Sequence, residues 1–316
     1  MDYKSILKCE RKVIVMKKVV VLMSTYNGEK YIKTQIESIL NQTGVKIELL
    51  VRDDGSTDKT TSILKKYEKE GKLNWYSGEN LKPAKSFMNL IKNAPDAEYY
   101  AFSDQDDYWK PEKLSRAVKI LNTFDSNEPA LYYSNTILVD KNLKILKEKP
   151  IQRGPFTEVG QAVIASNAAG CTMCFNKELL KMVRQYEPSY QIMHDGWVHK
   201  ICVVTGGNVY FDKKSYILYR QHGNNVIGGT SNIKKRWKER IINLVHPTYT
   251  RSRGIQELVT GYSEFMPKYN LEICSQVANY RINLKSRIKL LANRSIKTGD
   301  RRNDLMFRMA VLLGIF

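Results

Sequence analysis

Hydrophobic and polar residues follow two alternating patterns along the first hundred positions. An apolar, β-branched run at residues 19–23 predicts a buried strand, and residues 31–40 carry apolar side chains at helical spacing. The same succession continues, with strands predicted at 47–51, 73–76 and 99–102 and helices at 60–67 and 85–93. Strict alternation of strand and helix predicts an α/β fold, with a mainly parallel sheet flanked by helices.

The second half of the chain is less regular. Strands are predicted at 130–135, 137–139 and 210–219, and a helix at 195–204. Beyond Gly229, residues 233–245 are apolar at every fourth position and basic between, which predicts a basic amphipathic helix, and residues 281–291 predict another. We therefore divide the chain into an N-terminal extension (1–17), dispensable if Met16 is the natural start, a main domain (18–228) and a basic, mostly helical C-terminal region (229–316).

Composition and charge narrow the kinds of partner. With 316 residues, 42% hydrophobic and 26% charged, the chain is globular rather than disordered or fibrous. Its formal net charge is +19, and from Gly229 onward there are 17 basic and 6 acidic side chains. This balance fits nucleic acid, an acidic membrane surface or phosphorylated small molecules, and charge alone does not choose between them.

Cysteine usage and hydropathy indicate the compartment. The five cysteines, an odd number, are spread too widely for a disulfide framework, so we interpret them as buried thiols in a reducing cytoplasm. The sequence has neither an apolar run of spanning length nor a secretory leader pattern at Met1. We expect a cytoplasmic protein that is not an integral membrane protein.

Polar clusters follow three of the predicted strands, at residues 24–27, 52–56 and 103–107. In an open α/β sheet ligands bind beyond the carboxyl ends of the strands, where these clusters would meet. Carboxylates there can accept ribose hydroxyls or hold a divalent cation. Each cluster alone could be a solvated acidic turn, but together they favour a bound metal and nucleotide. Residues 27–30 lack the glycine pattern of dinucleotide-binding and P-loop proteins, which argues against dehydrogenases and ATPases.

These motifs resemble, in order and spacing, the donor half of family 2 glycosyltransferases with the GT-A fold. The resemblance covers residues 19–228 and rests on the runs STYN (24–27), QT (42–43), DDGSTD (53–58) and FSDQDDYWKP (102–111). The runs HDGW (194–197) and YRQHGNN (219–225) further resemble the bacterial rhamnosyltransferase branch. Residues 18–228 would then form a GT-A catalytic domain.

The resemblance also implies roles for individual residues. Thr25, Tyr26 and Asp53 would hold the nucleoside with Asp54 in support, while Gln105 and Gly170 would contact the donor. Asp104 would face the ribose and the metal, Asp106 would bind Mg2+ or Mn2+, and His222 would reach the metal or the diphosphate. Asp195 matches the catalytic base, although His194 stands where many members have Glu. His199 and His246 are interpreted as structural or surface residues.

The function expected from the resemblance is inverting, metal-dependent sugar transfer, with L-rhamnose passing from dTDP-rhamnose to a saccharide or lipid-linked saccharide in cell-surface polysaccharide synthesis. A UDP-hexose donor is the first alternative. A non-enzymatic nucleic-acid-binding protein is the second, although aromatic residues are sparse among the C-terminal basic residues, so we expect no nucleic acid partner. Those residues would instead hold the enzyme on an anionic membrane, at the inner face of the plasma membrane, or simply form the charged outer face of a helical cap.

Overall fold

The computed structural model describes residues 16–147, 155–166, 168–190, 193–221 and 251–316. Within these residues nine strands form one sheet in the order β3-β2-β1-β4-β8-β6-β9-β5, with β7 pairing β6 at its side. The first four strands along the chain are all parallel, which confirms the α/β pattern predicted for this half. They are β1 (Lys18–Thr25), β2 (Lys46–Asp53), β3 (Asn74–Ser77) and β4 (Tyr99–Ser103).

The other half of the sheet is mixed. Strand β8 (Cys174–Asn176) runs antiparallel to both β4 and β6 (Ala130–Val139), and β6 is parallel to β9 (Asn208–Arg220). The short strands β5 (Tyr108–Trp109) and β7 (Ile145–Lys147) pair antiparallel with β9 and β6. Four of the eight strand pairings are parallel, but these are the long ones, so the sheet is mixed and mostly parallel, as predicted.

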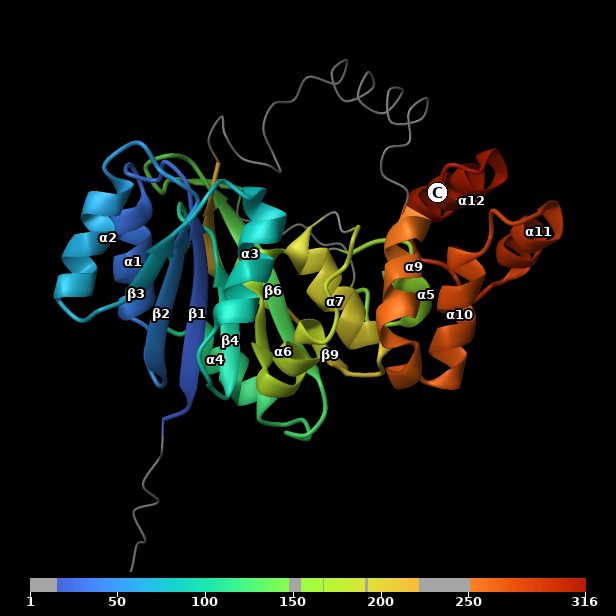
Figure 1. Cartoon of the computed structure of the whole chain (residues 1–316), viewed down its shortest axis with the longest axis horizontal. Helices are drawn as coiled ribbons and strands as arrows, with labels where there is room; N and C mark the ends of the chain where they lie inside the picture. The colour runs from blue at the N-terminus through green and yellow to red at the C-terminus, as the bar shows by residue number, and fades with distance from the viewer. Residues whose placement is uncertain (1–15, 148–154, 167, 191–192, 222–250) are drawn as a thin grey trace, which may run out of the picture.

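Helices cover both faces of the sheet, as Figure 1 shows. Along β1, Val19, Val21 and Met23 pack on one side, whereas Val20 and Leu22 pack on the other, and all five side chains are fully buried. The sequence of a strand that is buried on both faces is apolar at every position, which explains the pattern at residues 19–23. The helices that precede residue 205 are α1 (Ile32–Leu40), α2 (Thr60–Lys69), α3 (Lys82–Asn93), α4 (Lys113–Leu121), α5 (Val159–Ala162), α6 (Lys177–Arg184) and α7 (His194–Val204).

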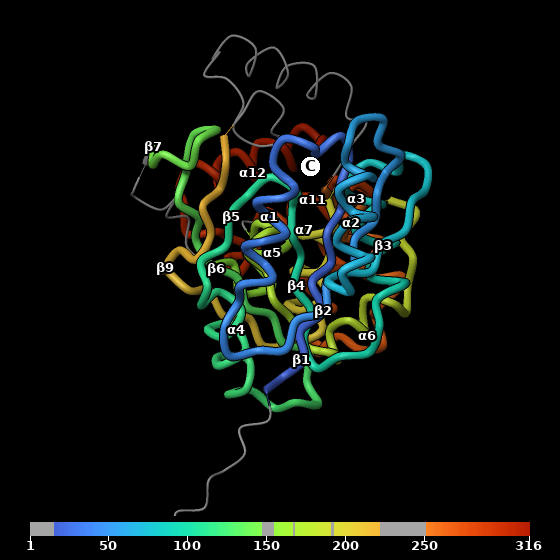
Figure 2. Tube along the Cα trace, turned by 90° about the vertical axis from the view of Figure 1, so that its left-hand side faces the viewer, coloured from blue at the N-terminus to red at the C-terminus, as the bar shows by residue number. Residues whose placement is uncertain are grey.

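The C-terminal helices pack onto this layered core. They are α9 (Arg251–Tyr262), α10 (Lys268–Ala278), α11 (Leu284–Ala292) and α12 (Arg301–Leu313), and in Figure 2 they lie behind the sheet. Ile255, Tyr262 and Val277 belong to the same hydrophobic cluster as residues of β4 and α7. The backbone oxygen of Phe316 accepts hydrogen bonds from Ser252 Oγ at 2.7 Å and Tyr280 Oη at 3.1 Å. Among the described helices, none is both long and apolar enough to cross a bilayer.

The structure also corrects details of the sequence predictions. Residues 130–139 form the single strand β6 instead of two, because the strand continues through a register shift around Asn135. The helix expected at 281–291 begins at Leu284, where Asn283 Oδ1 accepts a hydrogen bond from the backbone N–H of Ser286. The basic helix expected at 233–245 lies outside the described residues.

Candidate active site

The three polar clusters meet at the carboxyl edge of β1, β2 and β4. In the parallel register Thr25 lies opposite Asp53, and Met23 lies opposite Ser103. Gln105 bridges the first and third clusters, because its Oε1 accepts from Thr25 Oγ1 at 2.5 Å and from the Tyr26 backbone N–H at 2.9 Å. Its Nε2 donates back to the Tyr26 carbonyl at 3.1 Å. The predicted donor residues Thr25, Tyr26 and Gln105 therefore form one connected group.

Asp53 and Asp54 lie side by side in the chain but have different partners. The Asp53 carboxylate is fully buried and accepts hydrogen bonds from Ser56 Oγ at 2.5 Å and from Ser77 Oγ at 3.1 Å, besides backbone N–H groups of the turn that follows. Asp54 pairs with the buried guanidinium of Arg52 and accepts from Ser86 Oγ at 2.9 Å. Both carboxylates thus stabilise the loop after β2, and charge on Asp54 is compensated inside the protein.

Residues 104–107, which follow β4 and which we call the acidic run, bring several carboxylates close together. Burial, and then the neighbouring Asp106 and Asp195 carboxylates, raise the pKa of Asp104 to about 7. Burial and the same kind of repulsion, from Asp106 and Asp104, raise the pKa of Asp107 well above its usual range. Like charges held close together disfavour ionisation, and a bound cation would remove that penalty. The influence of Asp195 on Asp104 also indicates that two residues far apart in the chain share this site.

Asp195 lies in the first turn of α7, where the helix dipole favours a negative charge. Its Oδ1 accepts from the Gly196 backbone N–H at 2.7 Å, and its Oδ2 accepts from the Gly170 N–H at 3.2 Å. A Cβ added at Gly170 would lie 2.7 Å from His194 Nε2 and 3.4 Å from the Asp195 Cβ. Glycine at 170 therefore lets its backbone approach the predicted base and fix the orientation of the carboxylate.

His194, the departure from the family pattern, is an aromatic packing residue. Its buried ring stacks on Phe87 with centroids 3.9 Å apart and meets Phe102 edge-on at 4.9 Å. In the described part of the chain neither ring nitrogen has a hydrogen-bond partner, and burial lowers the pKa of His194 to about 4. The ring is therefore neutral near pH 7 and offers no second acid or base beside Asp195. His199 is likewise buried, in agreement with its structural interpretation, whereas His222 lies outside the described residues.

The donor atoms at this edge fit a hard divalent cation. Asp104, Asp107 and Cys171 each offer one atom, and these atoms lie within 4.8 Å of one another. Of the residues that the structure describes, none donates an N–H or O–H to Asp107 Oδ2 although this oxygen is buried. Carboxylate oxygens suit Mg2+ and Mn2+, while burial raises the pKa of the Cys171 thiol well above its ordinary value and keeps it protonated. The acidic run was recognised in the sequence, but the proximity of Asp107 and Cys171 needed the structure.

Arg220 is a further residue of this region whose contacts the sequence did not predict. At the end of β9, its Nε donates to the Asp106 carbonyl at 2.6 Å and its backbone N–H to Asp107 Oδ1 at 3.1 Å. Its guanidinium also bonds the Lys141 carbonyl and lies 4.5 Å from the centroid of the Tyr31 ring. Arg220 thus connects β9 and the start of α1 to the loop that carries the acidic run.

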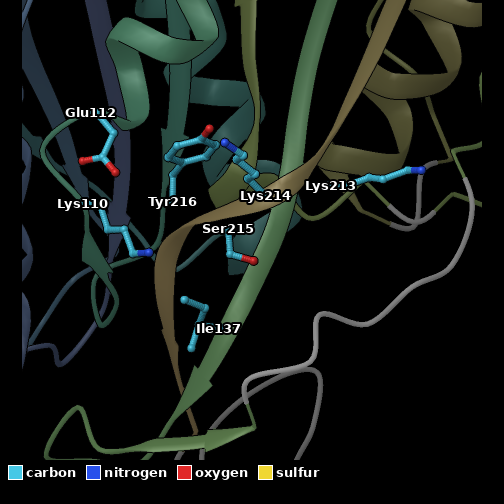
Figure 3. A pocket seen from close by; sticks show the side chains of 7 residues that line it. All are labelled: Lys110, Glu112, Ile137, Lys213, Lys214, Ser215 and Tyr216. Carbon is cyan, nitrogen blue, oxygen red and sulfur yellow. The ribbon is translucent and has the colours of Figure 1, made fainter.

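A hollow of about 570 Å³ opens elsewhere, along β9 near the end of β5. Figure 3 shows the side chains of Lys110, Lys213 and Tyr216 around it. Of the predicted donor, metal and catalytic residues that the structure describes, none lines this hollow, so it is distinct from the edge that carries Asp104 and Asp107.

Comparisons with known proteins agree with this geometry. The model of the family described as "Glycosyl transferase family 2" matches residues 20–186, more than half of the chain. A dTDP-rhamnosyl transferase, RfbG of Shigella flexneri, is 32% identical over 237 residues, which cover 68% of this chain and 77% of that protein.

Two solved structures share the fold. S. aureus TarS 1–349 in complex with UDP has a TM-score of 0.55 at 17% identity, over 93% of this chain and 90% of that one. The mannosyltransferase PcManGT from Pyrobaculum calidifontis, in complex with GDP-Man and Mn2+, has a TM-score of 0.50 at 17% identity, over 95% of this chain and 81% of that one. These similarities confirm the GT-A fold expected from the motifs. The chain is a glycosyltransferase that belongs to glycosyl transferase family 2.

Proposed function

We propose that this glycosyltransferase moves L-rhamnose from dTDP-rhamnose to a saccharide acceptor, with inversion, during synthesis of a cell-surface polysaccharide. The observation that carries the proposal is the Asp195 carboxylate, oriented by Gly170 and Gly196 and close enough to Asp104 to raise the pKa of that carboxyl. The donor is supported by the 32% identity with a dTDP-rhamnosyl transferase.

The proposal gives each of the site residues a role. Thr25, Tyr26 and Asp53 would hold the nucleoside with Asp54 in support, while Gln105 and Gly170 would contact the donor. Asp195 accepts the proton of the acceptor hydroxyl as that oxygen attacks the anomeric carbon, a contribution typically of about 10²–10⁴-fold in rate. Because one carboxylate acts as base and no second one serves as nucleophile, a single displacement inverts the configuration.

Asp104 and Asp106 would hold Mg2+ or Mn2+, with His222 as a further ligand. When bound there, the cation would neutralise the charge that develops on the departing nucleotide diphosphate. Support comes from the crowding of carboxylates around Asp104 and from the Mn2+ in the structure of the related mannosyltransferase.

A donor panel tests the proposal. The full chain is incubated with a saccharide acceptor and dTDP-rhamnose, UDP-glucose, UDP-GlcNAc or GDP-mannose, with Mn2+, Mg2+ or EDTA, and the released nucleotide diphosphate is measured. We expect fastest release from dTDP-rhamnose, none with EDTA, and an inverted anomeric configuration by NMR of the product. Preference for a UDP-hexose would refute the proposed donor, and turnover that survives EDTA would refute the metal requirement.

Two other observations bear on partners. Because TarS, which shares the fold, is seen in complex with UDP, a UDP-hexose donor is the alternative to dTDP-rhamnose. The net charge of +19 is the reason to test nucleic acid. Thermal unfolding with dTDP, UDP or an oligonucleotide separates a nucleotide-sugar enzyme from a nucleic-acid-binding protein, while the donor panel separates dTDP-linked from UDP-linked donors. We expect stabilisation by the nucleotide diphosphates with Mn2+ but not by the oligonucleotide.

We further propose that the enzyme works in the cytoplasm on the inner face of the plasma membrane, with a lipid-linked saccharide as acceptor. The support is the excess of basic side chains from Gly229 onward, which would attract anionic lipid headgroups.

A further inference from the structure

The segment that holds the last two helices carries more than half of the exposed large hydrophobic side chains in the described residues. Of the 14 large hydrophobic side chains that are exposed in the described residues, eight lie between positions 282 and 313. Soluble monomers rarely leave so many apolar side chains uncovered in one short stretch, and such surfaces usually mark an interaction site. The eight are Ile282, Leu284, Ile288, Leu305, Met306, Met309, Leu312 and Leu313.

On α12 these side chains occupy one face. Leu305, Met309 and Leu312 follow each other at spacings of four and three residues, so they align along the helix, and they are 60%, 53% and 62% exposed. Phe307 and Val311 take the opposite face and are buried in the core. The helix is therefore apolar on both sides, and only one of them is covered by protein in the described part of the chain.

Helix α11 carries a similar arrangement beside it. Leu284 and Ile288, four residues apart, are 70% and 57% exposed. The two helices are joined by a hydrogen bond of 2.8 Å from Arg308 Nη1 to the Leu291 carbonyl. They therefore form one unit, and we call their uncovered apolar side chains the α11–α12 face.

The positive charge around this face indicates what kind of partner it binds. Residues 281–316 contain nine basic and two acidic side chains, a net charge of +7. Arg301, Arg302 and Arg308 lie on the same helix as the exposed leucines, and all three are exposed. Two copies of the chain would bring like charges together at such a face, whereas an anionic lipid surface satisfies the apolar and the basic side chains at once.

The position of the face is consistent with the proposed acceptor. In Figure 1 the chain enters β1 from below, so the carboxyl ends of β1, β2 and β4 point upward, and α12 lies in the upper part of the molecule. Figure 2 shows α11 and α12 in the upper part as well. Helices α11 and α12, which carry the face, thus lie toward the same end of the molecule as the carboxyl ends of these strands.

We propose that the α11–α12 face inserts its apolar side chains into the interfacial region of an anionic membrane leaflet. This inference rests on the proposed membrane partner and adds to it a specific surface and a second kind of force. Attraction between basic side chains and headgroups is screened by salt, but burial of Leu305, Met309 and Leu312 among acyl chains is not.

Vesicle flotation tests the inference with the full chain. The vesicles contain phosphatidylcholine alone or mixed with phosphatidylglycerol, and binding is measured at low and at high salt. One variant carries Leu305→Gln, Met309→Gln and Leu312→Gln, and the matched control carries Ile145→Gln and Leu146→Gln, which replace exposed apolar residues on β7. We expect the α12 variant to bind the anionic vesicles at least about tenfold more weakly than the natural sequence and to lose the binding that resists salt. The control should bind normally.

Three outcomes would overturn the inference. Unchanged vesicle binding by the α12 variant would show that the face does not insert. Equal binding to neutral and anionic vesicles would contradict the role of the basic side chains. A dimer that the α12 substitutions dissociate, without lipid binding by either protein, would assign the face to a second copy of the chain. Release of nucleotide diphosphate is measured in parallel and should be equal in all variants, so failure of the donor proposal is seen separately.

Discussion

At the residue scale, Asp195 and its neighbour His194 differ in burial and in the backbone groups that they contact. Both lie at the start of α7, but Asp195 is only partly buried and is oriented by the N–H groups of Gly170 and Gly196, while the ring of His194 stacks on Phe87. The carboxylate can therefore meet a substrate, and the imidazole cannot without leaving the core. Of these two side chains, only Asp195 suits the proposed role of proton acceptor.

Replacing Asp195 by asparagine removes the proton acceptor with little change in shape. For Asp195→Asn we expect transfer to fall by about 10²–10⁴-fold, because a carboxamide cannot take the hydroxyl proton. The affinity for dTDP, measured by titration calorimetry with Mn2+, should stay close to that of the natural sequence. The control is Asp96→Asn, since the Asp96 side chain is 77% exposed beside Lys177 and outside the acidic run. Near-normal turnover by the Asp195→Asn variant would show that another group is the base.

Arg220 acts on the acidic run through the backbone. For Arg220→Gln we expect the unfolding free energy to fall by about 2–3 kcal/mol, because buried charged hydrogen bonds to the Asp106 and Lys141 carbonyls are lost. Affinity for Mn2+, measured by titration with the metal alone, should weaken as well, since the Asp106 loop loses its support. Arg302→Gln, at an exposed position of α12, is the control for unfolding and should be nearly neutral. Unaltered Mn2+ affinity in Arg220→Gln would limit Arg220 to a purely stabilising role.

At the element scale, glycines decide how closely the C-terminal helices approach the catalytic core. A Cβ at Gly160, in α5, would clash with the carbonyl oxygen of Ser295, which comes just after α11. A Cβ at Gly254, in α9, would meet nothing within 4 Å. The first glycine is required by packing, whereas the second only weakens its helix.

The two glycines therefore predict opposite results for the same substitution. Gly160→Ala should lower the unfolding free energy by about 1–3 kcal/mol, because backbone must move to remove the clash. Gly254→Ala should raise it by up to about 1 kcal/mol, because alanine favours the helix. Chemical denaturation measures both. Equal stability of the two variants would mean that the contact between α5 and Ser295 does not form in solution.

The elements also differ in how well the sequence predicted them. Strand β1 and helix α1 were recognised because one is a continuous apolar run and the other an apolar stripe at helical spacing. The strands β5 and β8, of two and three residues, are too short to show any period, and their place in the sheet comes from pairing with distant strands. The position of the acidic site was predicted because ligands bind beyond the carboxyl ends of parallel strands. Its connection to Gly170 and Asp195 was implied only by the family resemblance, because no local pattern relates residues so distant in the chain.

At the scale of the whole molecule, the C-terminal region combines two surfaces. Its inner face completes the core through Leu290, Ile296, Phe307, Val311 and Phe316, all buried in the same cluster as β4 and α7. Its outer face is basic and apolar. Because the C-terminal helices share their core with β4 and α7, the outer face keeps a fixed orientation to the carboxyl ends of the strands, which a flexible tail would not do.

Shared packing predicts what happens when residues 281–316 are deleted. Five buried apolar side chains would be lost, each worth about 1.5–3 kcal/mol, so the total is on the order of 10 kcal/mol. That is comparable to the whole stability of a typical domain, about 5–15 kcal/mol. The deletion also removes the Phe316 carbonyl that accepts hydrogen bonds from Ser252 and Tyr280. We therefore expect the shortened chain to aggregate or to lose its cooperative thermal transition, while the triple substitution at Leu305, Met309 and Leu312 keeps it. A shortened chain that unfolds at the same temperature as the full chain would contradict this packing. If the shortened chain is unstable, its loss of vesicle binding could come from unfolding, so the deletion would test the membrane surface only if the chain stayed folded.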